Sequence, residues 1–287
     1  MYLHITICFI CLTFSIFLLN KISPHPIFKL FLNWYKWVTF SLIFAFILEE
    51  MAWSSRPLWV HLSAGLALWF ILETAIYRFS IQMFNLSSIK LFPKYENDTS
   101  QNLWPINAQA LKIKEWMNIH GFKPRVYLKA KLINDIQIRQ AIYLNKDESI
   151  QLNVLFIPQK KENIQIYFTF LSKTNLEEYL LTDNQNMPFG GYYPKSWEVC
   201  RNPLRTSMDY LFKSHTIKMR QKKHNWRKIK GEDILYDVNQ RQKELENINR
   251  SLGFMNEPDE REIISNNGCF RVWLEMWLLA YFGGTLS

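Results

Sequence analysis

The chain has 287 residues, of which 48% are hydrophobic and 21% charged, and its formal net charge is +9. This composition excludes a chain that is disordered over most of its length, because enough apolar surface can be buried to offset the entropy of ordering. Glycine is scarce, at 9 residues, and no string matches the glycine-rich signatures of a dinucleotide-binding fold, a P-loop or a hydrolase nucleophile elbow.

Three apolar stretches near the N-terminus, at residues 2–19, 30–48 and 58–77, predict membrane-spanning helices. We interpret the first as an uncleaved span because no basic residue precedes it and no small-residue cleavage site is evident. A cleaved signal peptide is the alternative interpretation. Tryptophan and tyrosine residues stand at both ends of the second and third stretches, which is typical of the two interfaces of a bilayer.

Lysine and arginine residues cluster between the first two stretches and after the third, whereas the turn between the second and third is mainly acidic. The positive-inside rule therefore predicts that the N-terminus lies outside and that everything after residue 78 is cytoplasmic. We divide the chain into a membrane region at 1–95, a polar linker at 96–103 and a cytoplasmic α+β domain at 104–287.

Two ionisable residues within the predicted spans, Lys36 and Glu73, fall at similar depth if the second and third helices form an antiparallel hairpin. An ionisable group inside a bilayer is costly unless it is paired, so we predict that these two side chains pair. A proton or ion pathway through Glu73 is the alternative, but no chain of further carboxylates accompanies it.

The first part of the predicted domain combines a helix with a sheet. Helical spacing predicts a helix from about Asn107 to His120, with Gly121 as its stop. From 125 to 172 the hydrophobic period changes to two, which predicts a four-stranded antiparallel meander with one buried face. A capping-box pattern from Thr174 to Glu177 predicts a short helix to about Thr182.

The opposite face of the predicted sheet mixes tyrosines with cations, a combination that can stack bases and track phosphates. A solvated or helix-covered sheet face is the other interpretation of the same residues. They are Arg125, Tyr127, Lys129, Lys131, Arg139, Tyr143 and Tyr167.

Basic charge concentrates between residues 201 and 231, where 10 basic residues accompany one acidic residue. We predict a helix from Asn202–Pro203 to about Lys223, followed by a second, acidic helix that Gly253 ends. The candidate anion or lipid contacts are Lys213, Lys218, Arg220, Lys222, Lys223, Trp226, Arg227, Lys228 and Lys230.

Three interpretations of this basic stretch stay open. The two helices can fold back on each other so that their charges pair. Alternatively, a domain tethered at a membrane keeps the cations close to anionic lipid headgroups. Nucleic acid is the third possible partner, because a run of charge does not by itself distinguish between polyanions.

A long aromatic segment at 183–196 precedes Cys200, and loops of this length are often functional when they are ordered. Tyr192, Tyr193 and Cys200 are the candidate residues of a pocket, and a site near 183–200 would make the protein a membrane-tethered enzyme.

The C-terminal stretch 269–282 has apolar residues at helical spacing, which predicts the central core helix of the domain. Docking against the membrane face is the alternative for this helix.

The sequence identifies no catalytic residue, cofactor site or metal site. Cys8 and Cys11 form a C-x-x-C pair, but it lies in an apolar stretch without further ligands, so we interpret both as small hydrophobic residues. The remaining cysteines and the histidines after the spans lack the paired spacing of a zinc site, and the adjacent carboxylates point apart on a helix. A Cys200 nucleophile served by His215 is conceivable if the fold brings them together. We therefore expect a membrane-anchored interaction or scaffold module, with the lipid bilayer, anionic lipids or a protein as partner. The alternatives are a tethered enzyme and a nucleic-acid-binding module.

Overall fold

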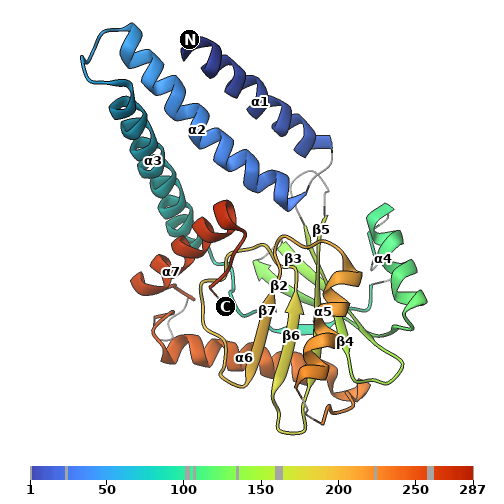
Figure 1. Ribbon diagram of the computed structural model, residues 1–287. Coiled ribbons are helices and arrows are strands. Elements are labelled where there is room, and N and C mark those ends of the chain that lie inside the picture. Colours follow the sequence, from blue (N-terminus) through green and yellow to red (C-terminus); the bar gives the residue numbers. More distant parts are fainter. Residues whose placement is uncertain are drawn as a thin grey trace. The chain divides into compact units, whose positions relative to one another are not determined.

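The computed structural model describes residues 2–22, 25–100, 104–105, 108–133, 136–158, 164–222, 225–256 and 262–286. The chain divides into two compact units, which we call the helical unit and the sheet unit. The helical unit comprises residues 1–83, 188–190 and 269–286, and the sheet unit comprises residues 84–187 and 191–268. Figure 1 shows the elements of both units.

Within the described residues, three helices are long and apolar enough to cross a membrane, which confirms that expectation. They extend beyond the predicted spans, because the polar residues that flank each apolar run continue the helix. Where α2 and α3 meet, a side chain on Gly65 would come within 2.9 Å of the Ser41 Cα atom, so glycine permits the close approach. The helices are α1 (Tyr2–Ile22), α2 (Pro26–Glu50) and α3 (Leu58–Leu86).

The sequence predicts that the C-terminal stretch 269–282 forms the central core helix of the α+β domain, but this stretch belongs to the helical unit. Helix α7 (Asn266–Trp277) continues into the π-helix η3 (Leu278–Phe282). The Asn33 side-chain amide donates a hydrogen bond to the Ala280 carbonyl over 3.0 Å. The Trp277 ring lies 5.9 Å from that of Trp37, centroid to centroid. The apolar face of this segment therefore packs against other helices of the helical unit, because its spacing suits any apolar neighbour.

The loop before the last strand of the sheet contributes residues 188–190 to the helical unit. The backbone N–H groups of Phe189 and Gly190 donate hydrogen bonds to the buried Glu275 carboxylate, and the Arg271 guanidinium donates to the Gly190 carbonyl over 2.7 Å. Gly190 has a φ of +68°, and a Cβ atom there would lie 2.7 Å from the Val272 nitrogen. Only glycine satisfies both conditions without strain.

The sheet unit is built on one sheet with seven strands in its described part, ordered as they occur in the sequence. Neighbours are antiparallel except β6 and β7, which are parallel. The sheet is therefore mixed, and the predicted four-stranded meander corresponds to β2 to β5. The strands are β1 (Tyr95–Asn97), β2 (Lys123–Ile133), β3 (Ile136–Leu144), β4 (Gln151–Pro158), β5 (Ile164–Lys173), β6 (Tyr179–Asp183) and β7 (Trp197–Arg201).

The predicted helix at 174–182 is wrong, because the range forms a turn that leads into β6. The Thr174 hydroxyl accepts hydrogen bonds from the backbone N–H groups of Leu176 and Glu178, so it closes a turn instead of capping a helix. Glu177 has a φ of +63°, which is incompatible with a helix and returns the chain toward the sheet. All five residues of β6 are buried, so the strand lacks the alternation that would reveal it.

Both faces of the sheet are buried, so the prediction of one buried face is wrong. Helices α4 (Ala108–Ile119) and α5 (Met208–Gln221) cover one face, and α6 (Ile234–Ser251) with the short helix η2 (Gly231–Asp233) lies at the other (Figure 1). Tyr143 is 5% exposed and Tyr167 is 3% exposed. The predicted base-stacking face is consequently not available to a ligand at these two positions.

Part of the predicted linker is ordered within the sheet unit. Glu96 and Asn97 lie in β1, and the buried Asp98 carboxylate forms an ion pair with Arg139 at 3.4 Å. Residues 101–103 lie outside the described residues, as does the predicted helix start at Asn107. Helix α5 begins after Ser207, whose hydroxyl accepts a hydrogen bond from the Tyr210 N–H group, rather than after Asn202.

Candidate anion-binding surface

The basic segment, residues 213–230, starts on α5 and then runs as extended chain along the end of the sheet (Figure 1). Three backbone contacts hold the extended part. Trp226 forms a β-bridge with Thr174, the Arg227 N–H group donates to the Lys173 carbonyl over 2.8 Å, and the Ile229 N–H group donates to Glu148 over 2.7 Å. Three cations of the predicted set, Arg227, Lys228 and Lys230, therefore lie on backbone held by these contacts, beyond the helix.

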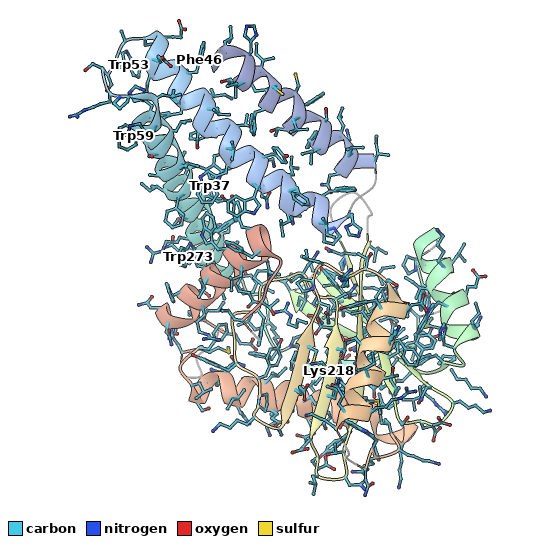
Figure 2. All side chains as sticks on the ribbon, viewed as in Figure 1. Trp37, Phe46, Trp53, Trp59, Lys218 and Trp273 are labelled. Carbon is cyan, nitrogen blue, oxygen red and sulfur yellow. The ribbon has the colours of Figure 1, made fainter. Side chains whose placement is uncertain are left out.

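Some of these cations have acidic partners within the sheet unit. Lys218, labelled in Figure 2, and Lys222 form ion pairs with Glu198 of β7, the first at 3.3 Å. The Arg227 guanidinium forms an ion pair with Glu177 at 2.7 Å. These partners lie on a strand and in a turn, not on the acidic helix α6 that the sequence suggested.

Four cations of the segment are exposed and have no ion-pair partner among the residues that the structure describes. Lys213 and Arg220 are seven positions apart on α5, which places them on one face of the helix. Lys228 and Lys230 are two positions apart in extended chain, so their side chains leave the backbone on the same side. Lys223, also predicted to contact anions, lies outside the described residues.

The extended end of the basic segment borders a small cavity of about 50 Å³. Its lining combines apolar residues with charged ones, four basic and two acidic, and it includes buried residues of β4, β5 and α6. The lining residues are Gln151, Leu171, Lys173, Arg227, Lys228, Ile229, Lys230, Asp233, Ile234 and Asp237.

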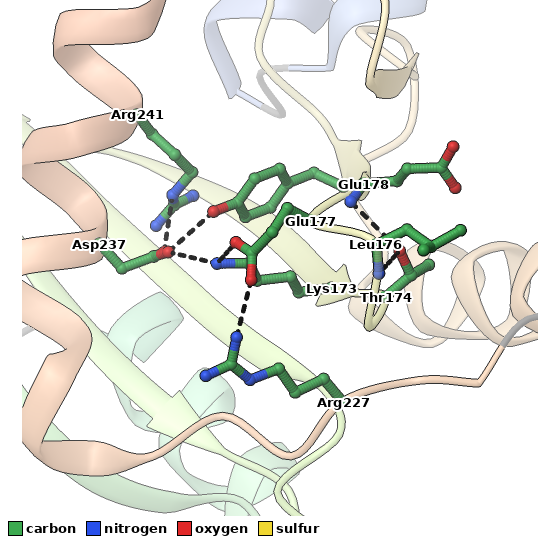
Figure 3. Close-up of polar contacts among 9 residues, drawn as sticks. Lys173, Thr174, Leu176, Glu177, Glu178, Arg227, Asp237 and Arg241 are labelled. Carbon is green, nitrogen blue, oxygen red and sulfur yellow. Dashed lines mark hydrogen bonds and ion pairs between the residues drawn. The ribbon is translucent and has the colours of Figure 1, made fainter.

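A network of charged side chains adjoins this cavity, centred on Asp237 (Figure 3). The Asp237 carboxylate accepts hydrogen bonds from the Tyr179 hydroxyl at 2.8 Å and from Lys173 at 3.3 Å, and it forms an ion pair with Arg241 at 3.0 Å. Lys173 also forms an ion pair with Glu177. Each acidic group of the network is therefore compensated by at least one cation.

The contacts within this network shift the pKa values of Asp237, Lys173 and Tyr179. Burial by itself would raise the pKa of Asp237, but the charge of Arg241 and the donors Tyr179 and Lys173 hold that pKa below its usual value. Burial opposes ionisation of Lys173, yet its contacts with Glu177, Tyr179 and Asp237 raise its pKa. Burial and the charge of Asp237 raise the pKa of Tyr179 to about 12. At neutral pH Asp237 and Lys173 are therefore both ionised and lie next to a neutral Tyr179.

The structure does not bring together the pocket residues proposed from the sequence. Cys200 faces α5, where Lys218 Nζ lies 2.6 Å from its sulfur. Tyr193 packs with Leu171 and Trp197 on the opposite face of the sheet. The Tyr192 backbone is held by hydrogen bonds to the Asn249 side chain at 2.8 and 2.9 Å.

Cys200 also lacks the features of an activated nucleophile. Burial raises the pKa of its thiol, although Lys218 acts in the opposite direction. His215 does not serve it, because the two imidazole nitrogens contact the hydroxyls of Ser172 and Thr182, each at 3.0 Å. Burial lowers the pKa of His215 to about 3, so this histidine is a neutral core residue.

The Ser172–His215–Thr182 arrangement was missed by sequence analysis, and it does not form a catalytic site. All three side chains are fully buried, at 0% exposure, so a substrate does not reach them. The three residues are far apart in the chain, so no local pattern in the sequence indicates that they meet. Within the described residues, no three His, Cys, Asp or Glu side chains converge in a way that could hold a metal ion.

In the helical unit, Glu73 has aromatic partners instead of the predicted Lys36. Its carboxylate accepts hydrogen bonds from Trp69 at 2.8 Å, from the Tyr77 hydroxyl at 2.6 Å and from the Tyr281 hydroxyl. An ion pair between Lys36 and Glu73 is not present among the described contacts. Three donors satisfy this carboxylate locally, which leaves no need for a lysine partner.

Comparison of the chain with protein-family models, with curated proteins and with solved structures found no match.

Proposed function

We propose that the protein is a membrane-anchored interaction module that contacts anionic lipid headgroups through the basic segment. The observation on which this rests is the set of four exposed cations without ion-pair partners in the described structure, Lys213, Arg220, Lys228 and Lys230. Unpaired charges of one sign favour contact with a polyanion. Each cation near an anionic leaflet contributes about 1 kcal/mol to the free energy of membrane binding.

The connection of the sheet unit to apolar helices favours a lipid over a soluble polyanion as its binding partner. The sheet unit follows the apolar helices in the sequence, and the chain after it returns to the helical unit at Cys269. The N-terminal end of the sheet unit is therefore connected to α3, which is long and apolar enough to span a bilayer, and its C-terminal end is connected to α7 of the helical unit. Such tethering raises the effective concentration of lipid headgroups at the module. In this proposal the sheet unit is cytoplasmic, in agreement with the positive-inside rule.

The test uses the full chain in nanodiscs, with a polarity-sensitive dye on a Gln221→Cys variant whose native cysteines are replaced by serine. Gln221 is exposed at the end of α5, between the two pairs of free cations. We expect the dye emission to shift when about a third of the phosphatidylcholine is replaced by phosphatidylglycerol, and the shift to vanish at high salt.

The decisive comparison is between two fourfold variants with the same change in charge. Replacing Lys213, Arg220, Lys228 and Lys230 by glutamine should abolish the lipid-dependent shift. The matched control replaces four exposed lysines elsewhere in the sheet unit, and it should retain the shift: Lys112, Lys123, Lys131 and Lys146. Equal loss in both variants, or no shift in the parent chain, would contradict the proposal.

Nucleic acid is a weaker candidate partner. Tyr143 and Tyr167 are buried, and the Trp226 indole donates a hydrogen bond to the Met219 carbonyl at 3.2 Å. These three rings are held in the protein, so they do not form a base-stacking surface. The test is to add a single-stranded oligonucleotide to the full chain in neutral nanodiscs. If the oligonucleotide binds and the anionic lipid produces no dye shift, this second function replaces the first.

A further inference from the structure

We infer that the cavity at the extended end of the basic segment is a binding site for one phosphate group. The inference deepens the proposed function and rests on it, since it assigns a defined chemical group to one part of the basic segment. The cavity residues that carry the argument are Lys173, Lys228, Lys230 and Asp237.

The available positive charge favours an anion. Lys228 and Lys230 line the cavity, are exposed, and have no ion-pair partner in the described part of the chain. Lys173 is held at the cavity by Glu177, Asp237 and Tyr179, so its three donors are engaged within the protein and it adds positive charge rather than a free donor. The ammonium groups of Lys228 and Lys230 are thus the two available to one ligand, and lysine ammonium groups are common phosphate ligands.

The acidic residues at the cavity do not reverse this balance. Asp237 is compensated by Arg241 at 3.0 Å and by Lys173 at 3.3 Å. Asp233 is the second acidic lining residue, and it is exposed to solvent, which screens its charge. Against these two carboxylates the lining contains three lysines and Arg227, which is itself paired with Glu177. The excess of cations favours an anion over a divalent metal ion.

The size and the rigidity of the cavity favour a single phosphate group. About 50 Å³ provides room for only a few water molecules. A nucleotide or a whole lipid is too large, whereas one tetrahedral group is not. The hydrogen bonds of the Arg227 and Ile229 N–H groups to Lys173 and Glu148 hold the backbone that bears Lys228 and Lys230. Preorganised cations of this kind lose little entropy when the ligand binds.

The same chemistry is presented by a phosphomonoester lipid and by free phosphate. The experiment is calorimetric titration of inorganic phosphate into the full chain in phosphatidylcholine nanodiscs, at constant ionic strength with chloride as the balancing anion. Lys228→Gln with Lys230→Gln should weaken phosphate binding at least tenfold, because two charge-assisted contacts are lost. Lys213→Gln with Arg220→Gln removes the same charge outside the cavity and should change the affinity less than about twofold.

A second arm places phosphatidate in the nanodiscs. If phosphatidate weakens the apparent affinity for inorganic phosphate, the natural ligand is a lipid headgroup; if it has no effect, the ligand is a soluble phosphate. Failure of the parent chain to bind phosphate, or equal weakening in both variants, would overturn the inference. The dye shift at Gln221 is measured on the same samples, so a retained shift without phosphate binding refutes the cavity and leaves the proposed function standing.

Discussion

The indole Nε1 of Trp34 donates a hydrogen bond to the backbone carbonyl of Tyr281 over 2.8 Å, although 247 positions separate the two residues. The Tyr281 hydroxyl in turn donates to Glu73 on α3. Within the helical unit, the last helix is therefore tied to both α2 and α3. These contacts join the end of the chain to the helices near its start, so the helical unit combines segments from both ends of the sequence.

Trp34→Phe should loosen the C-terminal helix. The substitution keeps an aromatic ring but removes the donor, which leaves the Tyr281 carbonyl without its indole partner at a cost of about 1 kcal/mol. We expect proteolytic removal of the C-terminal residues from the chain in nanodiscs to accelerate roughly fivefold. Trp53→Phe is the control, since Trp53 is 71% exposed (Figure 2). Identical cleavage rates for the two variants would contradict this prediction.

Gly65→Val should separate α2 from α3. A Cβ atom at this position would lie 2.9 Å from Ser41 Cα, which is backbone and does not yield as a flexible side chain does. Overpacking of this kind costs about 1 to 3 kcal/mol. Thermal unfolding of the full chain in nanodiscs should reveal a lower midpoint. Ala67→Val, at an exposed position of the same helix, should leave the midpoint close to that of the parent chain.

Asp237→Asn should destabilise the sheet unit by about 3 kcal/mol, because it leaves Arg241 and Lys173 without their shared carboxylate in a mostly buried setting. Hydrogen exchange of the α6 amides measures the effect. Glu177→Gln breaks pairs that are largely exposed and should cost less than about 1 kcal/mol. A smaller effect at position 237 than at 177 would show that the network does not depend on Asp237.

His215 should make the sheet unit less stable in mild acid. The pKa of this buried imidazole is lowered to about 3, whereas in the unfolded chain it is about 6.5. Between these two values the unfolded state binds the extra proton, so stability is complete above about pH 6.5 and falls as the pH is lowered. Near pH 5 the loss is about 2 kcal/mol relative to neutral pH.

The measurement is the free energy of opening of the α5 amides from hydrogen exchange at several pH values. Other groups also titrate in this range, so the parent chain is compared with a His215→Gln variant, whose side chain does not titrate. The difference in pH dependence between the two proteins isolates the histidine. Parallel pH profiles would show that His215 is not responsible.

Several elements could be predicted because their pattern is local. Uninterrupted apolar runs revealed α1 to α3, and alternation at Leu128 and Ala130 or at Leu152 and Val154 revealed β2 and β4. The same alternation was misread as one buried face. Leu128 and Leu152 belong to clusters on opposite faces of the sheet, and the pattern of a single strand does not say which face its apolar residues occupy.

The candidate surface could be predicted in part. The charge run identified the basic segment, but not which cations are free, because Glu198 and Glu177 reach them only through the folding of β7 and the turn before β6. The cavity had no sequence signal, since its lining comes from β4, β5, the extended segment and α6. The compensating partner of Lys173, Asp237, lies 64 positions away.

The sequence by itself determined which segments are apolar enough to cross a membrane, which strands alternate and where positive charge accumulates, because each of these depends on neighbours within a few residues. Tertiary structure alone decided that the C-terminal helix groups with the N-terminal helices and that both sheet faces are covered. It also decided which cations of the basic segment have an acidic partner among the described residues. These features depend on contacts between residues far apart in the chain, and such contacts are set by the packing of whole elements rather than by any local pattern.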